Sequence, residues 1–192
     1  MARPVDTQRR GRTLAAVTDY VLEHGLSDLS LRPLASALGT STRMLLYDFS
    51  SKEGLVLAVL GEVRRRESAL LATHLETSTV PPSDLVRTIW DWLASPERAP
   101  FLRLFFEVYV QAMNHPDVYT ARGREMVTEW LDQLGSALAD PGTGPADPVL
   151  ATLVIAVLRG LALDRLATGE GSRTDQALER FVALMDPPGS PG

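Results

Sequence analysis

The chain has 192 residues, of which 45% are hydrophobic and 22% are charged, and its formal net charge at pH 7 is −5. This length allows one domain or a small domain followed by a larger one, and the composition is that of a globular protein. Because the chain contains no cysteine, disulfides and thiolate metal sites are excluded, and the composition suits a reducing cytosol.

The pattern of apolar residues predicts an all-α fold of about nine helices. Apolar residues recur at helical spacing, and no run alternates β-branched and polar residues between turn signals. The predicted helices cover residues 7–24, 31–38, 42–49, 51–75, 84–94, 101–114, 118–139, 149–168 and 174–185.

Short polar residues predict where several of these helices begin. Thr40 or Ser41 is the expected N-cap of the third helix. Ser50 and Glu53 stand at capping-box spacing, which predicts the start of the fourth helix. Residues 169–173 are expected to form a turn before the last helix.

No segment predicts secretion or membrane insertion. Residues 1–12 are rich in arginine and lack an apolar core segment. The longest apolar run, 149–158, is shorter than the roughly 20 residues that span a bilayer. Residues 187–192, PPGSPG, predict a disordered tail. We therefore expect a cytoplasmic protein without a membrane partner.

Basic residues are concentrated in the first third of the chain. Residues 1–66 carry ten Lys/Arg and seven Asp/Glu, a net charge of +3, whereas residues 67–192 carry nine and seventeen, a net charge of −8. A basic segment on an acidic body attracts phosphate to one end of the molecule, so this asymmetry favours a nucleic-acid partner.

Residues 29–60 predict a helix-turn-helix unit. Two short helices are joined by a tight turn at residues 39–41, and an amphipathic helix precedes and follows them. In such a unit the second short helix enters the major groove of DNA. Leu45 and Phe49, at positions i and i+4, can anchor this helix to the core. The side chains left to face DNA include Thr42, Arg43 and Met44.

The same segment follows a recurrent pattern: Thr/Ser-x-Arg-x-Ile/Leu-Ala, then Gly-Val-Ser, then Leu-Tyr-x-His-Phe and Ser-Lys-Glu-x-Leu. The matching residues are Ser30, Arg32, Leu34, Ala35, Gly39, Ser41, Leu45, Phe49, Ser51, Lys52, Glu53 and Leu55. In this pattern the chain resembles the DNA-binding domain of the TetR family of transcriptional regulators. It departs from the pattern at three positions, with Thr40 in place of Val, Leu46 in place of Tyr and Asp48 in place of His.

The resemblance implies which side chains contact DNA. Arg43 is expected to make a bidentate contact with guanine, worth roughly 1–3 kcal/mol of discrimination, and Arg32 is the second candidate for such a contact. Met44 is expected to contact a thymine methyl. Lys52, at a helix N-terminus, and Tyr47 are expected to reach phosphates. The expected DNA-binding residues are Arg32, Ser41, Thr42, Arg43, Met44, Tyr47 and Lys52.

Asp48 places an acidic residue near the DNA-facing end of the unit. We expect its carboxylate to cap a helix or to pair with an arginine. Arg9, Arg10 and Arg12 of the first helix are expected to reach the DNA backbone or the minor groove.

The last two predicted helices favour a homodimer. The helix over 149–168 is apolar nearly all round, and such a helix must be buried on all sides. The resemblance implies that these helices pair with their copies, which suits a palindromic operator in double-stranded DNA. The expected interface residues are Leu153, Val157, Gly160, Leu161 and Phe181.

Aromatic residues cluster in the predicted helices between 84 and 139. The resemblance implies a ligand cavity there, and such cavities are apolar with few polar groups. The effector is therefore expected to be a small apolar or aromatic molecule. The expected lining residues are Trp90, Phe105, Tyr109, Met113 and Trp130.

Catalytic, metal and cofactor sites are not expected. His24, His74 and His115 lack metal-ligand spacing, and the chain carries no nucleophile-elbow, Walker or dinucleotide-binding motif.

The sequence thus predicts a DNA-binding domain at 1–52, a regulatory and dimerisation domain at 53–186 and a tail at 187–192. The expected function is a bacterial repressor that an effector releases from its operator. The alternatives are a helical interaction protein with a degenerate DNA-binding head, an activator, or a regulator that needs no ligand.

Overall fold

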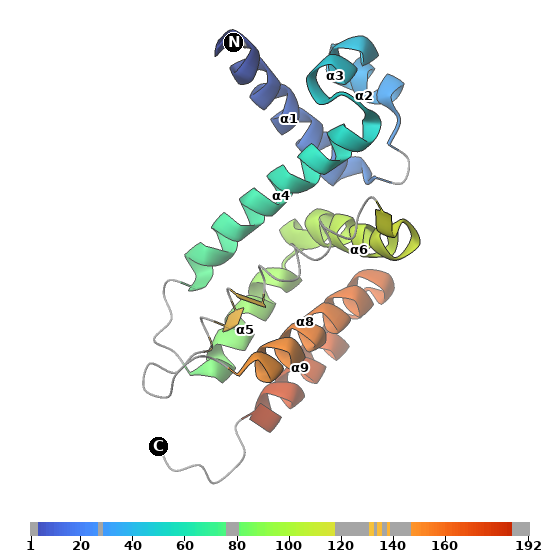
Figure 1. Ribbon diagram of the computed structural model, residues 1–192. Coiled ribbons are helices and arrows are strands. Elements are labelled where there is room, and N and C mark those ends of the chain that lie inside the picture. The colour runs from blue at the N-terminus through green and yellow to red at the C-terminus, as the bar shows by residue number, and fades with distance from the viewer. Residues whose placement is uncertain are drawn as a thin grey trace. The chain divides into compact units, whose positions relative to one another are not determined.

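The computed structural model describes residues 4–26, 29–75, 81–117, 131–132, 134–135, 138 and 147–185. Every element within these ranges is helical (Figure 1), which confirms the predicted all-α fold. The predicted helix at 118–139 falls largely outside the described residues. The helices are α1 (Pro4–His24), α2 (Leu31–Ala37), α3 (Thr42–Phe49), α4 (Lys52–Leu75), α5 (Pro82–Ala94), the 3-10 turn η1 (Pro96–Arg98), α6 (Ala99–Asn114), α8 (Pro148–Thr168) and α9 (Gly171–Met185).

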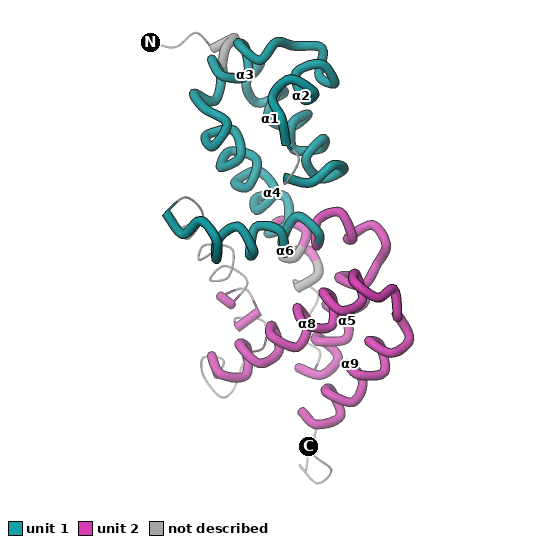
Figure 2. The backbone as a smooth tube through the Cα atoms, turned by 90° about the vertical axis from the view of Figure 1, so that its right-hand side faces the viewer, with its two compact units in different colours: residues 1–68, 103–124 teal, residues 69–102, 125–192 magenta. Residues whose placement is uncertain are grey.

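The chain divides into two compact units (Figure 2). Unit 1 contains residues 1–68 and 103–124, and unit 2 contains residues 69–102 and 125–192. The division falls inside α4 and inside α6, so two continuous helices contribute residues to both units.

Unit 1 has a core to which each of its first four helices contributes. Val17 and Val21 of α1 have no exposed surface, because a spacing of four residues puts both on one helical face. Leu34 of α2, Leu45 of α3 and Val59 of α4 are at most 1% exposed. Burial of each such side chain contributes about 1.5–3 kcal/mol, so these contacts hold the two short helices in place.

The start of α4 differs from the predicted capping box. Ser51, not Ser50, is the capping residue, since its Oγ accepts the N–H of Gly54 at 2.9 Å. Ser50 instead follows the last residue of α3 with a φ of 69° and a ψ of −41°. The N–H of Ser51 donates to the carbonyl of Phe49 at 2.9 Å, which closes a γ-turn that reverses the chain between the two helices. The prediction placed the cap one residue early because adjacent serines offer the same side chain.

Unit 2 contains α5, α8 and α9, which pack against one another. Ile89 of α5, Leu158 of α8 and Leu178 of α9 are each 1% exposed and belong to this core. The predicted turn at 169–173 is too long, because α9 begins at Gly171. A single left-handed residue, Gly169 with φ 73°, is enough to end α8.

Candidate nucleic-acid interface

The turn between α2 and α3 is closed by a Schellman motif. Gly39 adopts a φ of 61°, a conformation that costs glycine little. The N–H of Thr40 donates to the carbonyl of Ala35 at 2.9 Å, and the N–H of Gly39 donates to Ser36 at 3.2 Å. Ser41 then caps α3 by accepting the N–H of Met44 at 3.2 Å. Both ends of the turn are therefore fixed by hydrogen bonds.

The helix α3 has one buried face and one exposed face. Leu45 and Phe49 are 1% and 4% exposed and anchor the helix, as the sequence predicts. On the opposite side Tyr47 is 70% exposed and Met44 is 37% exposed. Arg43 is also exposed. An eight-residue helix with this division presents polar and adaptable side chains to a partner.

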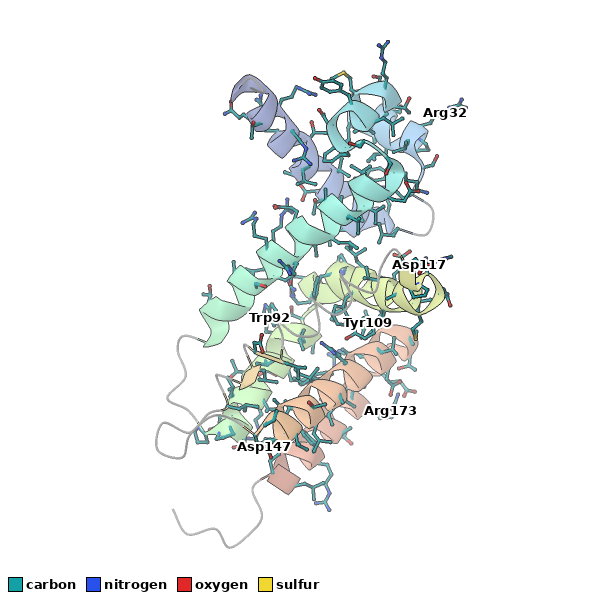
Figure 3. The ribbon with its side chains drawn as sticks, viewed as in Figure 1. Arg32, Trp92, Tyr109, Asp117, Asp147 and Arg173 are labelled. Atoms are coloured by element: carbon teal, nitrogen blue, oxygen red, sulfur yellow. The ribbon has the colours of Figure 1, made fainter. Side chains whose placement is uncertain are left out.

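The structure places all seven predicted DNA-binding residues between the start of α2 and the start of α4. Arg32 projects from the first turn of α2 into solvent (Figure 3). Ser41 and Lys52 are exposed at the N-termini of α3 and α4, and Thr42 is half-buried. Free backbone N–H groups and a lysine at such a terminus are the groups that bind phosphate.

Glu53 also occupies the first turn of α4. Hydrogen bonding to its own backbone N–H, and secondarily to Ser51, holds the pKa of its carboxyl below the usual value. The carboxylate of Glu53 thus competes with an incoming phosphate for a backbone N–H at the start of α4.

Asp48 pairs with an arginine, which is one of the two roles that the sequence predicts for it. Arg9 donates from Nη1 to Oδ2 of Asp48 at 2.9 Å and from Nη2 to Oδ1 at 2.6 Å. Arg10 donates from Nε to the backbone carbonyl of Asp48 at 2.9 Å, and its guanidinium lies 5.2 Å from the centre of the Phe49 ring. Arg9 and Arg10 of α1 therefore contact the C-terminal turn of α3, whereas Arg12 of the same helix is exposed.

A hydrogen bond between α6 and the end of α1 was not predicted. Oε2 of Glu107 accepts the N–H of Leu26 at 2.8 Å within unit 1. Gly25 has a φ of 81° and terminates α1, which exposes this N–H to a partner from elsewhere. A separation of 81 residues leaves no local sequence signal for such a contact.

The residues predicted to line a ligand cavity fall in different places. Trp90 belongs to unit 2, is 2% exposed and donates its indole N–H to Asp175 at 2.9 Å. Phe105 and Tyr109 belong to unit 1, where their ring centres lie 4.9 Å apart. Met113 is 72% exposed, and Trp130 lies outside the described residues.

The residues predicted for the dimer interface lie on α8 and α9. Leu153 is 54% exposed; Gly160 is also exposed, and Val157, Leu161 and Phe181 are half-buried. Two further apolar side chains were not predicted: Val149 of α8 is 64% exposed and Leu184 of α9 is 65% exposed. In this chain alone, α8 and α9 therefore leave large apolar side chains in solvent.

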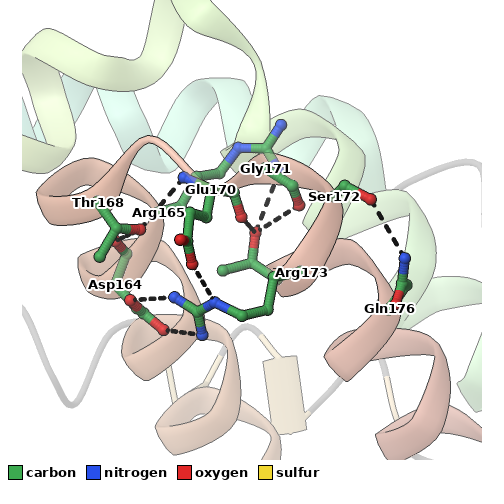
Figure 4. Close-up of polar contacts among 9 residues, drawn as sticks. Asp164, Arg165, Thr168, Glu170, Gly171, Ser172, Arg173 and Gln176 are labelled. Atoms are coloured by element: carbon green, nitrogen blue, oxygen red, sulfur yellow. Dashed lines mark hydrogen bonds and ion pairs between the residues drawn. The ribbon is translucent and has the colours of Figure 1, made fainter.

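The junction of α8 and α9 is held by two arginines (Figure 4). Arg173 donates from both terminal nitrogens to Asp164 at 2.7 Å and from Nε to Glu170. Arg165 donates to Asp175 at 2.7 Å and to the carbonyl of Gly171 at 3.1 Å. These contacts join residues before and after the tight turn, and they fix the angle between α8 and α9.

The fold and the helix-turn-helix geometry define a DNA-binding regulator of transcription. Residues 15–59 match the family model of bacterial regulatory proteins of the tetR family. Over 192 aligned residues the chain is 30% identical to the transcriptional repressor AcnR of Corynebacterium diphtheriae, covering 94% of this chain and 90% of that protein. The chain belongs to the TetR family of transcriptional regulators.

Solved structures agree with this assignment at the level of the fold. A TetR-family regulator from Cytophaga hutchinsonii superposes with a TM-score of 0.78 at 15% identity, covering 97% of each chain. The multidrug-binding protein EbrR, solved with proflavin, gives a TM-score of 0.67 at 23% identity, covering 90% of this chain and 98% of that one. Among the described residues, no helix combines the length and apolarity that a membrane span requires.

Proposed function

We propose that this protein is a repressor that binds a palindromic operator as a homodimer and is released by a small apolar or aromatic effector. The observation that carries the proposal is the outward face of α3, where Arg43 and Tyr47 are exposed beside Met44 while Leu45 and Phe49 anchor the helix. This arrangement is the one that a recognition helix needs in order to enter the major groove.

Each exposed side chain of the unit has a role in DNA binding that suits its chemistry. Arg43 reads guanine through two hydrogen bonds, and Met44 contacts a thymine methyl. Lys52, Thr42 and Tyr47 hold the phosphates on either side of the groove. Arg32, at the N-terminus of α2, is the second candidate for a contact with guanine, and Ser41, at the N-terminus of α3, is assigned to the DNA backbone.

The exposed apolar face of α8 and α9 supports the homodimer. Leu153 and Val149 are more than half exposed in the isolated chain, and a second copy would bury them in a symmetric four-helix contact. A two-fold dimer places two recognition helices about 34–36 Å apart, which matches successive major grooves and requires a palindromic site.

The names of similar proteins support repression over activation, and they support an aromatic effector. AcnR is named a transcriptional repressor, and EbrR was solved with proflavin, a planar aromatic molecule. We propose that an effector of this class binds in the regulatory part and changes the spacing of the two heads through α4, a continuous helix from Lys52 to Leu75. The effector acts only through its different affinities for the two spacings.

Selection from a library of random duplexes tests the proposal. The wild-type protein is compared with Arg43→Ala, Lys52→Ala and the control Arg180→Ala, which removes an exposed arginine of α9. We expect enrichment of a palindrome. Arg43→Ala should relax the preference at one base pair per half-site, with a loss of about 1–3 kcal/mol. Lys52→Ala should weaken all sites and lower the slope of log K against log salt by about one per head.

The control should behave as the wild type. A wild-type protein that enriches no sequence at moderate salt would overturn the proposal and favour an interaction protein with a degenerate head. An enriched operator that neither small aromatic nor small apolar compounds release would instead favour a regulator that needs no ligand.

A further inference from the structure

We propose that the ion pair between Arg9 and Asp48 positions the recognition helix, so that operator affinity depends on two residues that do not touch DNA. The proposal rests on the proposed function, since it concerns how the head binds its operator. Arg9 and Asp48 are positioning residues: they act on DNA through α3.

The geometry of the pair is that of a strong, directional contact. Two parallel N–H···O bonds of 2.9 and 2.6 Å join the guanidinium to both carboxylate oxygens, a bidentate form that fixes orientation as well as distance. The side chain of Asp48 is only 4% exposed, whereas that of Arg9 is 33% exposed. A carboxylate so deeply buried needs a charged or hydrogen-bonding partner, and Arg9 supplies it.

Arg10 adds a second contact at the same end of α3. Its Nε binds the carbonyl of Asp48, one of the last carbonyls of the helix, which have no partner inside it. The Arg10 guanidinium also lies over the Phe49 ring, a favourable cation–π contact. Two consecutive residues of α1 thus hold the C-terminal turn of α3.

This contact matters because α3 is short. The helix has eight residues, about two turns, and Ser41 caps its N-terminal end. The contact with α1 fixes the other end, directly beside Tyr47. Since hydrogen bonds to bases and phosphates weaken steeply with distance and angle, a small rotation of α3 alters several DNA contacts at once.

A direct role in DNA binding predicts the opposite result for the acidic partner. Removal of a carboxylate next to phosphates normally strengthens DNA binding, because it removes a repulsion. If Asp48 positions α3 through Arg9, the neutral variant Asp48→Asn weakens binding instead. The sign of this one effect therefore separates the two roles.

The test measures the affinity of the full-length protein for its enriched operator as a function of salt. The variants are Asp48→Asn, Arg9→Gln, and the exchange Arg9→Asp with Asp48→Arg; Arg12→Gln provides the reference for loss of one positive charge from α1. We expect Asp48→Asn and Arg9→Gln each to weaken binding on the order of tenfold, with the wild-type salt slope. The exchange should restore part of the affinity, because it rebuilds the ion pair with its charges reversed, whereas independent losses at the two positions would add.

Circular dichroism is the control that checks whether each variant is folded. Should Arg9→Gln fail to fold, Arg9→Lys keeps the charge but loses the bidentate contact, and it should weaken binding with the fold intact. Binding by Asp48→Asn that equals or exceeds that of the wild type overturns the proposal, as does a fall of about one in the salt slope of Arg9→Gln. A wild-type protein without an operator overturns the proposed function and this inference together, whereas unaltered variants of a binding wild type overturn this inference alone.

Discussion

Gly54 and Gly61 are both glycines inside α4, yet their surroundings are opposite. A Cβ at Gly54 would lie 2.2 Å from the carbonyl oxygen of Phe49, which is backbone and cannot move aside, whereas a Cβ at Gly61 would have no atom within 4 Å. Phe49, the last residue of α3, therefore lies so close to the first turn of α4 that only glycine fits at position 54.

The variant Gly54→Ala is expected to destabilise the protein by about 1–3 kcal/mol, because the methyl group forces the backbone of α3 away from α4. Its matched control, Gly61→Ala, should stabilise the protein by about 0.5–1 kcal/mol through helix propensity alone. Unfolding by urea measures both free energies. Equal effects of the two variants would show that α3 can shift without cost.

The sequence predicts the kind of contact that Asp48 makes but not its partner. Asp48 stands where the family pattern has His, and pairing with an arginine is one of its two expected roles. The partner itself is separated from Asp48 by 39 residues, so only the packing of α1 against α3 identifies it.

Ion pairs on α4 connect it to α1. Arg66 donates from Nη1 to Asp19 of α1 at 2.6 Å and from Nε to Glu62, one turn earlier, at 2.9 Å. Hydrogen bonds from Arg65, and then from Arg66, lower the pKa of Glu62 to about 2 from its usual value. Because the folded chain binds this proton less readily than the unfolded chain, the stability due to Glu62 is present above pH 4.5 and is lost as the pH falls toward 2.

The variant Glu62→Gln removes this dependence. We expect it to be less stable than the wild type at neutral pH, where the carboxylate is charged in both states and its ion pairs favour folding. The difference should shrink as the pH is lowered below 4.5. Urea unfolding at neutral pH and near pH 3 measures it. A difference that stays constant over this range would contradict the assigned cause.

At the scale of the helices, local sequence patterns predict the buried face of a helix better than its first residue. The cores of α1, α3 and α5 were predictable because apolar periodicity and burial agree, as at Leu85, Ile89 and Leu93, which are each at most 3% exposed. The start of α9 was misplaced, since Gly171 and Ser172 resemble turn residues. The structure explains their helical state: Arg165 binds the carbonyl of Gly171 and so holds the first turn of α9.

At the scale of the whole molecule, the exposed apolar face of α8 and α9 is the surface through which we propose that two copies associate. We expect the wild-type protein to be a dimer at micromolar concentration. Leu153→Glu should produce monomers, because a second copy would bury an unpaired carboxylate at a cost of several kcal/mol. The control Thr88→Glu adds the same charge to an exposed position of α5 and should remain dimeric. Analytical ultracentrifugation distinguishes the two, and a dimeric Leu153→Glu would place the interface elsewhere.

The unequal burial of Arg9 and Asp48 also bears on the order in which mutations can accumulate in a lineage. If Asp48 is lost first, the remaining guanidinium is 33% exposed and water can still hydrate it; if Arg9 is lost first, a carboxylate that is 4% exposed remains without its partner. Loss of Asp48 before Arg9 therefore costs less stability than the reverse order. Diverging descendants of this chain should pass through forms that keep the arginine after the aspartate has gone, and seldom through the reverse.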